Sequence, residues 1–595
     1  MESKGLDPHW RWLTAVGLVL AVVIYVYPLS LGIPLLDPDE GLHASIAQEM
    51  VERGDWITPR LLGEPFLDKP ILYFWAEALS LKLFGMSEAA VRFPGLMFGL
   101  LGAVTTGVVA WRMLGSSVGL VAGLLYATTI LPAALAQAAA HDVALVPWVN
   151  LALLLFWESQ HTTSRRRFAM HTLGIGLLLG LACLTKGLVG VALVGTAWGC
   201  YLLLAQRLSI AACLQGVAVL ALAALVAAPW YLAFEARSPG YLYYFFVERH
   251  LLGFATSTQN HGSAPWWYYL PILLGGGLPW IGYLPVTILD GIARRREARG
   301  DQKGTVPFSR RNGTLQEDAP VPPRKSGQSP SGGRDGALLL LGCWIVACTL
   351  LLSLSHSKLV TYIWPVFPAV ALLAAVAWAR LIEGRLSEGA RRCFAQTLLS
   401  SSAGGILLMP IAMLVVQEEF SIRFAWPVWL AVGVVAISSP LPALLWLKGH
   451  PKATLAGGTL SLALHFAFIM TWIVPQVATT TSAGDLATHY NGLGELPTQL
   501  WVAEERLGSF IFYLDPQLRA GLREGQLQYV RFAELPTMKP GVVIALPENE
   551  VDWADRHIDL DGLVYDSVGR YRVYHGTQFD PRPPLTASES QPVLR

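Results

Sequence analysis

The chain has little charge for its length. Only 14% of its 595 residues are Asp, Glu, Lys or Arg and 53% are hydrophobic, whereas soluble domains usually carry about 25% charged residues. This composition excludes a single soluble domain, and it excludes a disordered protein because disorder requires low hydrophobicity and high net charge. The formal net charge of +1 excludes a strongly basic protein that binds nucleic acid. The sequence therefore predicts an integral membrane protein, and its 21 Trp and 38 Pro fit aromatic belts and interrupted helices.

Several common signals are missing. No CxxC pair occurs and none of the six cysteines falls in a long polar loop, so we expect neither a disulfide framework nor a cysteine metal site. No A-x-A-like cleavage site accompanies the long N-terminal apolar run, so we interpret that run as a retained anchor rather than a removed signal peptide. No Gly-rich phosphate loop is present, so the sequence shows no nucleotide-binding motif of that kind. We find no internal repeat.

Apolar runs long enough to cross a bilayer as helices recur along the chain. We count thirteen, and they are 12–36, 90–113, 116–136, 143–158, 168–185, 187–205, 209–234, 268–292, 337–355, 360–380, 394–417, 426–447 and 454–475. Loops rich in Lys and Arg alternate with acidic or neutral loops, and the positive-inside rule puts the basic loops in the cytoplasm. We therefore expect a multi-pass protein of the cytoplasmic (inner) membrane, with a cytoplasmic N-terminus and a periplasmic C-terminus.

The apolar runs divide the chain into two predicted domains. Residues 1–475 form a transmembrane domain, in which 37–89 is the first outer loop and 293–336, rich in Pro, Gly, Ser and charge, is a disordered cytoplasmic linker. In residues 476–595, short apolar runs alternate with polar helical stretches, which predicts a small extracytoplasmic α/β domain with a frayed tail. The predicted fold class is thus an α-helical polytopic membrane protein with about 13 transmembrane helices and a small C-terminal α/β domain.

The first outer loop has the most informative sequence. It holds ten acidic and four basic residues, and Asp39 and Glu40 stand at the start of a predicted helix just above the bilayer. Asp39 has two interpretations: a helix N-cap with Glu40 favouring the helix dipole, or part of a reactive site at the interface. The second is favoured by the charged residues that follow in the loop, Arg60, Asp68 and Lys69.

Further polar residues fall on the same predicted outer side. Asp142 begins an outer turn, Lys186 and Lys358 each lie between apolar runs, and His261 precedes an aromatic cluster. Each has a simple explanation: a carboxylate that reaches water, a lysine that anchors a helix, or a solvated loop histidine. Lysines on the outer side do not serve only to set the membrane topology, because the positive-inside rule would then place them in the cytoplasm. Together, these groups suit transfer from a phosphate-linked lipid, since lysines bind phosphate, a carboxylate acts as general base, and a divalent ion neutralises a phosphate leaving group.

At five places the sequence resembles a known family. These places are Asp39-Glu40 with Gly54-Asp55-Trp56, Thr58-Pro59-Arg60 through Asp68-Lys69-Pro70, Leu184-Thr185-Lys186-Gly187, His261 through Trp267, and Ser357-Lys358 through Tyr362. In this order they resemble the polyprenyl-phosphate-dependent glycosyltransferases of the GT-C fold, in particular the aminoarabinose lipid A transferases and their relatives, the protein O-mannosyltransferases. The resemblance covers about residues 1–475.

The resemblance implies a role for the matching residues of the outer face. Asp39, with Glu40 beside it, is implied as the catalytic carboxylate that activates the acceptor, and Asp142 as a support for the site. The implied donor-phosphate pocket consists of Arg60, Lys69, Lys186, Lys358 and Tyr362.

The resemblance also implies a metal site. Asp68 and His261 match metal-ligand positions of the family, so a divalent ion (Zn, Mg or Mn) is an implied cofactor. This chain departs from its relatives at Asp68, where they usually have Glu. It also departs at Leu42 and His43, where they often have Arg and Tyr.

The implied reaction transfers a sugar from a polyprenyl-phosphate donor to a lipid A, glycan or protein acceptor on the outer face of the membrane. The acceptor attacks the anomeric carbon opposite the phosphate, so the configuration inverts; no nucleotide or nucleic acid takes part, and we expect a monomer. Two other functions stay open: a flippase or transporter of lipid-linked sugar, and an O-antigen polymerase or ligase. Transporters commonly have inverted repeats and charges near the midplane, and the polymerases and ligases typically have an Arg-rich outer loop.

Overall fold

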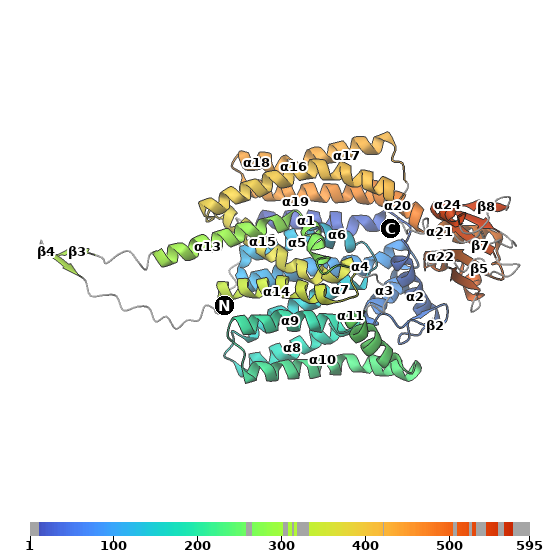
Figure 1. Ribbon diagram of the computed structural model, residues 1–595, viewed down its shortest axis with the longest axis horizontal. Helices are drawn as coiled ribbons and strands as arrows, with labels where there is room; N and C mark the ends of the chain where they lie inside the picture. Colours follow the sequence, from blue (N-terminus) through green and yellow to red (C-terminus); the bar gives the residue numbers. More distant parts are fainter. Residues whose placement is uncertain are drawn as a thin grey trace.

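The computed structural model describes residues 11–256, 264–300, 308–311, 314–317, 333–420, 422–503, 508–522, 526–530, 543–556 and 564–574. Within them, a bundle of long helices carries a small sheet at one end, and the helices α2 and α3 lie between the bundle and the sheet (Figure 1). The predicted fold class, an α-helical multi-pass protein with a small C-terminal α/β domain, is confirmed.

Ten helical segments of the described part are long and apolar enough to cross a membrane. They are Arg11–Ser30 (α1, η2, η3), Glu88–Leu114 (α4), His141–Ser159 (α7), Arg165–Lys186 (α8), Ile210–Arg237 (α10), Asp335–Leu354 (in α14), Val360–Ile382 (η6, α15), Glu388–Glu419 (α16), Trp426–Leu447 (α17, α18) and Pro451–Thr481 (α19, η7, α20). An eleventh candidate is the pair Tyr269–Gly276 (α12) and Trp280–Glu297 (η5, α13), which is bent by 90°. Two shorter apolar helices are Ser116–Ala127 (α5) and Val189–Leu204 (α9). Each of the thirteen predicted runs coincides with one of these segments, while the number that crosses the bilayer stays a prediction.

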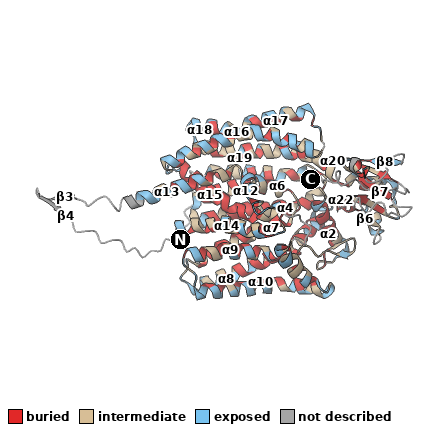
Figure 2. Ribbon diagram, in the orientation of Figure 1, coloured by how far each residue is buried: buried red, intermediate tan, exposed pale blue. Residues whose placement is uncertain are grey.

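The helices differ in how much of their surface the protein covers. In α7 and in the η6–α15 segment, 78% of the most apolar stretch is buried, whereas in α16 the share is 11%. Figure 2 shows the same contrast, with more exposed residues on the helices at the edges. The exposed side chains of Leu407, Ile411 and Leu414 on α16 are stable where lipid rather than water surrounds the helix, because water penalises exposed apolar surface.

Between its first two apolar segments the chain forms a layer on the end of the bundle that carries the C-terminal sheet (Figure 1). This layer consists of α2 (Asp39–Arg53), a hairpin of β1 (Arg60–Leu61) and β2 (Glu64–Pro65), and α3 (Leu72–Phe84). α2 ends at Gly54, whose φ of +66° is a left-handed conformation that glycine adopts without strain. Ten of the fifteen residues of α2 are buried, because α3 packs on one side of it and the C-terminal domain on another.

The C-terminal domain begins with α21 (Gly484–Leu493) and contains a five-stranded sheet of order β6-β5-β7-β9-β8. Its strands are β5 (Leu500–Ala503), β6 (Leu527–Val530), β7 (Val543–Pro547), β8 (Tyr565–Val568) and β9 (Tyr571–Tyr574), and its short helices are α22 (Gly508–Tyr513), α23 (Pro516–Ala520) and α24 (Val551–Ala554). β5 pairs in parallel with β6 and β7, and β9 pairs antiparallel with β7 and β8. All five residues of the central strand β7 are buried. The boundary between 475 and 476 stays a prediction, and the tail from 575 lies outside the described residues.

The predicted linker 293–336 is described only in part. α13 (Leu284–Gly300) extends into it, β3 (Phe308–Arg311) and β4 (Thr314–Glu317) pair as an antiparallel hairpin, and α14 begins at Arg334. The other residues of the linker lie outside the described part of the chain, so its disorder stays a prediction.

Candidate active site

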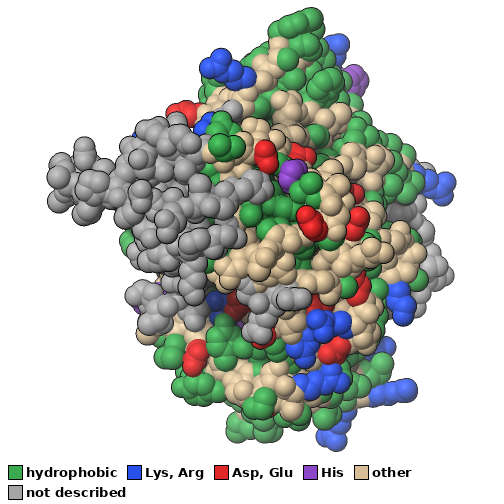
Figure 3. Space-filling view, turned by 90° about the vertical axis from the view of Figure 1, so that its right-hand side faces the viewer, with side chains coloured by type: hydrophobic (Ala, Val, Ile, Leu, Met, Phe, Trp, Pro, Cys, Tyr) green, Lys and Arg blue, Asp and Glu red, His purple; other side chains and the backbone are tan. Residues whose placement is uncertain are grey.

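Asp39 is the first residue of α2, and its side chain is exposed. Pro38 occupies the N-cap position and no side chain caps the helix, so the interpretation of Asp39 as an N-cap is wrong. Figure 3 looks onto the end of the molecule that carries the C-terminal sheet, where acidic and basic side chains gather. An exposed carboxylate at this end is accessible to a substrate, as the predicted catalytic role requires.

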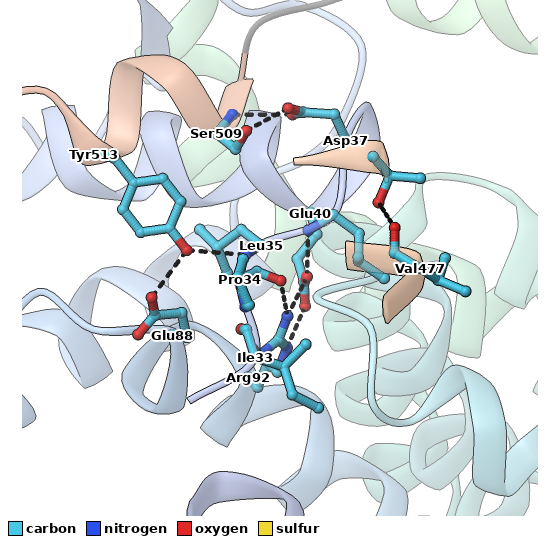
Figure 4. Close-up of polar contacts among 12 residues, drawn as sticks. Ile33, Pro34, Leu35, Asp37, Glu40, Glu88, Arg92, Val477, Ser509 and Tyr513 are labelled. Carbon is cyan, nitrogen blue, oxygen red and sulfur yellow. Dashed lines mark hydrogen bonds and ion pairs between the residues drawn. The ribbon is translucent and has the colours of Figure 1, made fainter. Parts of the chain in front are cut away.

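Glu40, the next residue, is buried and fully engaged. Its two oxygens accept hydrogen bonds from Nε and Nη2 of Arg92 on α4, both at 2.7 Å, and the backbone N–H of Leu36 donates to Oε2 at 2.8 Å. Arg92 also donates to the carbonyls of Ile33 and Pro34, at 2.5 and 2.9 Å (Figure 4). A bidentate guanidinium–carboxylate pair is strong and directional. The geometry therefore favours a role for Glu40 in holding the start of α2 rather than in touching a substrate.

Asp142 and Lys186 meet in a second buried ion pair. Asp142 is the second residue of α7 and Lys186 the last residue of α8, and their side chains are 10% and 8% exposed. The Lys186 ammonium donates to Asp142 Oδ1, and it also lies 4.2 Å from the ring centre of Tyr362 on η6 (Val360–Val366). Such contacts offset the cost of burying charge. The simple explanations of Asp142 as reaching water and Lys186 as an interfacial anchor are wrong, because each is buried against the other.

Two residues near α2 and α3 act electrostatically on the lysine of this pair. Asp39 and Lys69 both act electrostatically on Lys186, and both also act on His43 of α2. The structure therefore brings together predicted site residues from α2, the loop before α3, α7, α8 and η6. This site cluster, Asp39, Lys69, Asp142, Lys186 and Tyr362, holds two ammonium groups, one buried carboxylate and one exposed carboxylate. Of these groups, the two ammonium donors are the ones suited to an anionic ligand.

Two further residues of the predicted phosphate pocket have other contacts. Lys358 is 8% exposed, and its ammonium donates to the carbonyl of Ala264 at 3.1 Å. Arg60 donates from Nη1 to the carbonyl of Gly63 at 2.7 Å, and its Nε lies 4.0 Å from Oδ2 of Asp55. The described contacts of Arg60 are thus in its own loop. The roles of both residues at a donor phosphate stay predictions.

Asp68 has a cation and a phenol as partners. The hydroxyl of Tyr244 donates to Asp68 Oδ1 at 2.5 Å, and Nε of Arg249 lies 3.7 Å from the same oxygen. Burial, together with the hydrogen bond to Asp68, raises the pKa of Tyr244 to about 12. Within the described residues no group of three or more His, Cys, Asp or Glu is arranged to hold a metal ion, and a neighbouring guanidinium disfavours a second cation. His261 lies outside the described residues, so the predicted metal site stays a prediction.

A buried histidine pair adjoins the site cluster, and sequence reasoning gave it no role. Nδ1 of His43 is 2.6 Å from the carbonyl oxygen of Ala139, and the His43 ring packs edge-to-face on His141 with 4.6 Å between ring centres. Since a carbonyl only accepts, Nδ1 carries the proton and Nε2 has the lone pair when the ring is neutral. Burial lowers the pKa of His43, with Lys69 acting in the same direction and the Ala139 carbonyl opposing it. The sequence signal was the position of His43, one helical turn after Asp39.

Comparison with known proteins gives the class to which these features belong. A family model described as dolichyl-phosphate-mannose-protein mannosyltransferase matches residues 68–232. Proteins named undecaprenyl phosphate-alpha-4-amino-4-deoxy-L-arabinose arabinosyl transferase are similar. The one from Edwardsiella ictaluri is 34% identical over 60% of this chain and 58% of its own length, and the one from Aeromonas salmonicida is 31% identical over 67% and 66%. The chain thus spans less than two thirds of the length of these two relatives.

Solved structures give the fold. The crystal structure of ArnT from Cupriavidus metallidurans bound to undecaprenyl phosphate covers 96% of this chain and 98% of its own, with a TM-score of 0.68 at 21% identity. The apo structure of the same protein gives a TM-score of 0.69. The resemblance predicted from the five motifs is therefore confirmed: the chain resembles the polyprenyl-phosphate glycosyltransferases and has the GT-C fold of ArnT.

Proposed function

We propose that the chain is an integral membrane glycosyltransferase that moves a sugar from a polyprenyl-phosphate donor to an acceptor on the outer face of the cytoplasmic membrane. The observation that carries this proposal is the site cluster, in which residues from five separate segments interact beside the exposed carboxylate of Asp39. The names of the arabinosyl transferases and the lipid in the ArnT structure support undecaprenyl phosphate as the carrier. In this arrangement the N-terminus is cytoplasmic and the C-terminal domain extracytoplasmic.

The lysines bind the leaving group in this proposal. Lys69 and Lys186 face the donor phosphate, and Asp142 and Tyr362 hold the Lys186 ammonium in place before the donor arrives. As the bond between the anomeric carbon and the phosphate oxygen breaks, negative charge grows on the phosphate, and fixed ammonium groups at a site of low dielectric stabilise it.

Asp39 acts on the acceptor. An acceptor hydroxyl gives its proton to the Asp39 carboxylate while its oxygen bonds to the anomeric carbon on the face opposite the phosphate. One bond forms as one breaks, so the configuration inverts and the products are the glycosylated acceptor and the lipid phosphate. A divalent ion at Asp68 and His261 remains a separate proposal, and no step depends on it because the described residues do not supply its ligand set.

An apolar cavity favours a lipid as the acceptor. It has a volume of about 480 Å³ and lies between transmembrane helices, with Glu40 and Arg92 in its lining together with Trp280 and Met470. A hydrocarbon chain in this cavity presents its head group beside Asp39, the neighbour of Glu40. Asp39, Lys69 and Lys186 are all outside the lining, and Glu40, the neighbour of Asp39, is part of it, so in this proposal the cavity takes the acceptor chain. A lipid such as lipid A is therefore favoured over a glycan or protein.

The test is transfer by the purified protein with a panel of polyprenyl-phosphate sugars, read by mass spectrometry of the released lipid phosphate and the product. Asp39→Asn keeps the size of the side chain and removes the base, so we expect a fall in kcat of about 100-fold or more with the lipid phosphate still bound. Glu64→Gln, at an exposed carboxylate of the same loop, is the control and keeps full activity. Full activity of Asp39→Asn would instead favour the flippase or transporter, whose site need not include this residue.

A further inference from the structure

The start of α2 is in contact with α22 of the C-terminal domain. The backbone N–H of Ser509 donates to Asp37 Oδ1 at 2.9 Å, and the Ser509 hydroxyl donates to Asp37 Oδ2 (Figure 4). Ser509 is fully buried, and its hydroxyl also accepts from the backbone N–H of Ala483 at 2.8 Å. Asp37 stands two residues before Asp39, so this hydrogen-bonded pair fixes the backbone at the entry to the helix.

Two glycines let the backbones of α2 and α22 touch. A Cβ added to Gly41 would lie 2.2 Å from the backbone nitrogen of Ser509, and one added to Gly508 would lie 2.1 Å from that of Leu42. Separations below 3.0 Å do not occur for real Cβ atoms, and here the neighbouring atoms are backbone. No other residue fits at either position without moving the C-terminal domain off α2.

A third link joins α22 to the transmembrane bundle. The hydroxyl of Tyr513 donates to Oε1 of Glu88 on α4, and it accepts from the backbone N–H of Leu35, both at 2.9 Å. The same helix α4 holds Glu40 through Arg92. Residues 33–41 are therefore held by α4 on one side and by α22 on the other, as Figure 4 shows.

We infer that α22 is part of the reaction site and that Ser509, through Asp37, is a positioning residue for the Asp39 carboxylate. This inference rests on the proposed function. Displacing a catalytic group by about 1 Å lowers a rate by about 100-fold, and the α2–α22 contact (Asp37, Gly41, Gly508 and Ser509) restrains the backbone on both sides of Asp39. The C-terminal domain thus acts in catalysis in addition to any contact with an acceptor.

The other end of α2 offers a matched control. Glu52 forms an ion pair with Arg519, which follows α22 in the same domain. Glu52 lies thirteen residues after Asp39, about 20 Å along the helix at 1.5 Å per residue. Asp37→Asn and Glu52→Gln make the same chemical change, from carboxylate to amide, at two carboxylates that contact the C-terminal domain.

The first experiment measures kcat and KM of the full-length variants. We expect kcat to fall about tenfold to 100-fold in Asp37→Asn and in Ser509→Ala, with the KM for the donor changed less than twofold. The kcat of the double variant should be little lower than that of either single variant, because Asp37→Asn and Ser509→Ala remove the same hydrogen-bonded link. We expect Glu52→Gln to keep the kcat of the unmodified protein. Equal losses in Asp37→Asn and Glu52→Gln, or no loss in either Asp37→Asn or Ser509→Ala, would overturn the inference.

The second experiment does not depend on activity. Hydrogen–deuterium exchange of the amides of residues 36–46 should rise at least threefold in Ser509→Ala and in Asp37→Asn, and stay unchanged in Glu52→Gln. Faster exchange with unchanged kcat would show that the contact exists but does not position Asp39, which contradicts the inference. If the unmodified protein transfers no sugar from any donor, the proposed function fails and the catalytic role of Ser509 fails with it. The exchange result would still decide whether the α2–α22 contact restrains residues 36–46.

Discussion

Two buried ion pairs lie close to Asp39, and they differ in what surrounds them. In the pair of Glu40 and Arg92, the guanidinium satisfies both carboxylate oxygens and two backbone carbonyls. In the pair of Asp142 and Lys186, a second ammonium, that of Lys69, acts on the first. We call the first pair closed, because both carboxylate oxygens and all three guanidinium nitrogens have hydrogen-bond partners within the protein. We call the second pair open, because in the proposed function Lys69 and Lys186 bind an anionic ligand. In our proposal, completeness of hydrogen bonding separates a pair that fixes the backbone from a pair that binds a ligand.

Arg92→Met should break the closed pair with the largest effect. The change leaves a buried Glu40 carboxylate and the carbonyls of Ile33 and Pro34 without their donor, and breaking a buried pair costs about 3–5 kcal/mol. We expect a lower free energy of unfolding and a poor yield of folded protein, measured by thermal unfolding in detergent. Arg112→Met on the same helix is the control: Arg112 is 51% exposed in its pair with Glu158, and we expect a loss below about 1 kcal/mol. An equal loss of unfolding free energy in Arg92→Met and Arg112→Met would contradict the distinction between a closed pair and an exposed one.

Lys186→Met should break the open pair and reduce binding of the donor lipid. The ammonium that we propose binds the donor phosphate is lost, and the buried Asp142 carboxylate loses its partner, so we also expect a lower free energy of unfolding. We expect the Kd for polyprenyl phosphate to rise about tenfold to 100-fold, measured by direct binding to the purified protein. Lys82→Met, at an exposed lysine of α3, should leave the Kd unchanged. A Kd unaffected by Lys186→Met would mean that this pair is also structural.

The sequence predicted the fold well, and it singled out both members of the open pair without joining them, for physical reasons. Hydrophobic length alone locates membrane helices, so each of the thirteen runs coincides with a helical segment or with the bent pair α12–α13. Lysine and aspartate in an apolar chain are costly to bury without a partner, which is why both residues stood out, but only the structure shows that Asp142 and Lys186 pair with each other.

The closed pair and the α2–α22 contact were not predictable from the sequence. Arg92 lies within an apolar run and its partner is 52 residues away, so no local pattern joins the two. Gly41 and Gly508 are separated by nearly the whole chain, and a lone glycine has many explanations. Contacts of this kind depend on tertiary packing, whereas the predicted features depend on hydrophobic length and on residue types in family order. His43 is an intermediate case, because its spacing from Asp39 was visible but its partner Ala139 was not.

Gly187→Ala tests whether the open pair depends on its backbone. Gly187 follows Lys186 with a φ of +63°, and an added Cβ would lie 2.3 Å from Nε2 of His250. The strain and the clash should move the end of α8 and with it the Lys186 ammonium, so we expect kcat/KM to fall about tenfold. Gly195→Ala in α9 is the matched control, since no atom lies within 4 Å of its Cβ position, and it should keep full activity. Activity of Gly187→Ala at the level of Gly195→Ala would show that Lys186 does not need this backbone geometry.

Glu77 on α3 extends the comparison to a buried carboxylate for which the structure shows no cation. It is 0% exposed, neither of its oxygens has a hydrogen-bond partner in the described residues, and burial raises its pKa well above 4.5, with Glu40 adding repulsion. A folded-state pKa above the unfolded value means that stability is full below about pH 4.5 and falls as the pH rises toward the folded pKa. Glu77→Gln removes this ionisation, so the variant should be more stable than the unmodified protein by about 1 kcal/mol at pH 8, with a smaller difference at pH 5. Tm values in detergent at both pH values measure this difference, with Glu64→Gln as the exposed control. If Glu77→Gln instead lowers the stability relative to the unmodified protein, and lowers it more at pH 8 than at pH 5, the Glu77 carboxylate is ionised and paired, like Glu40 in the closed pair.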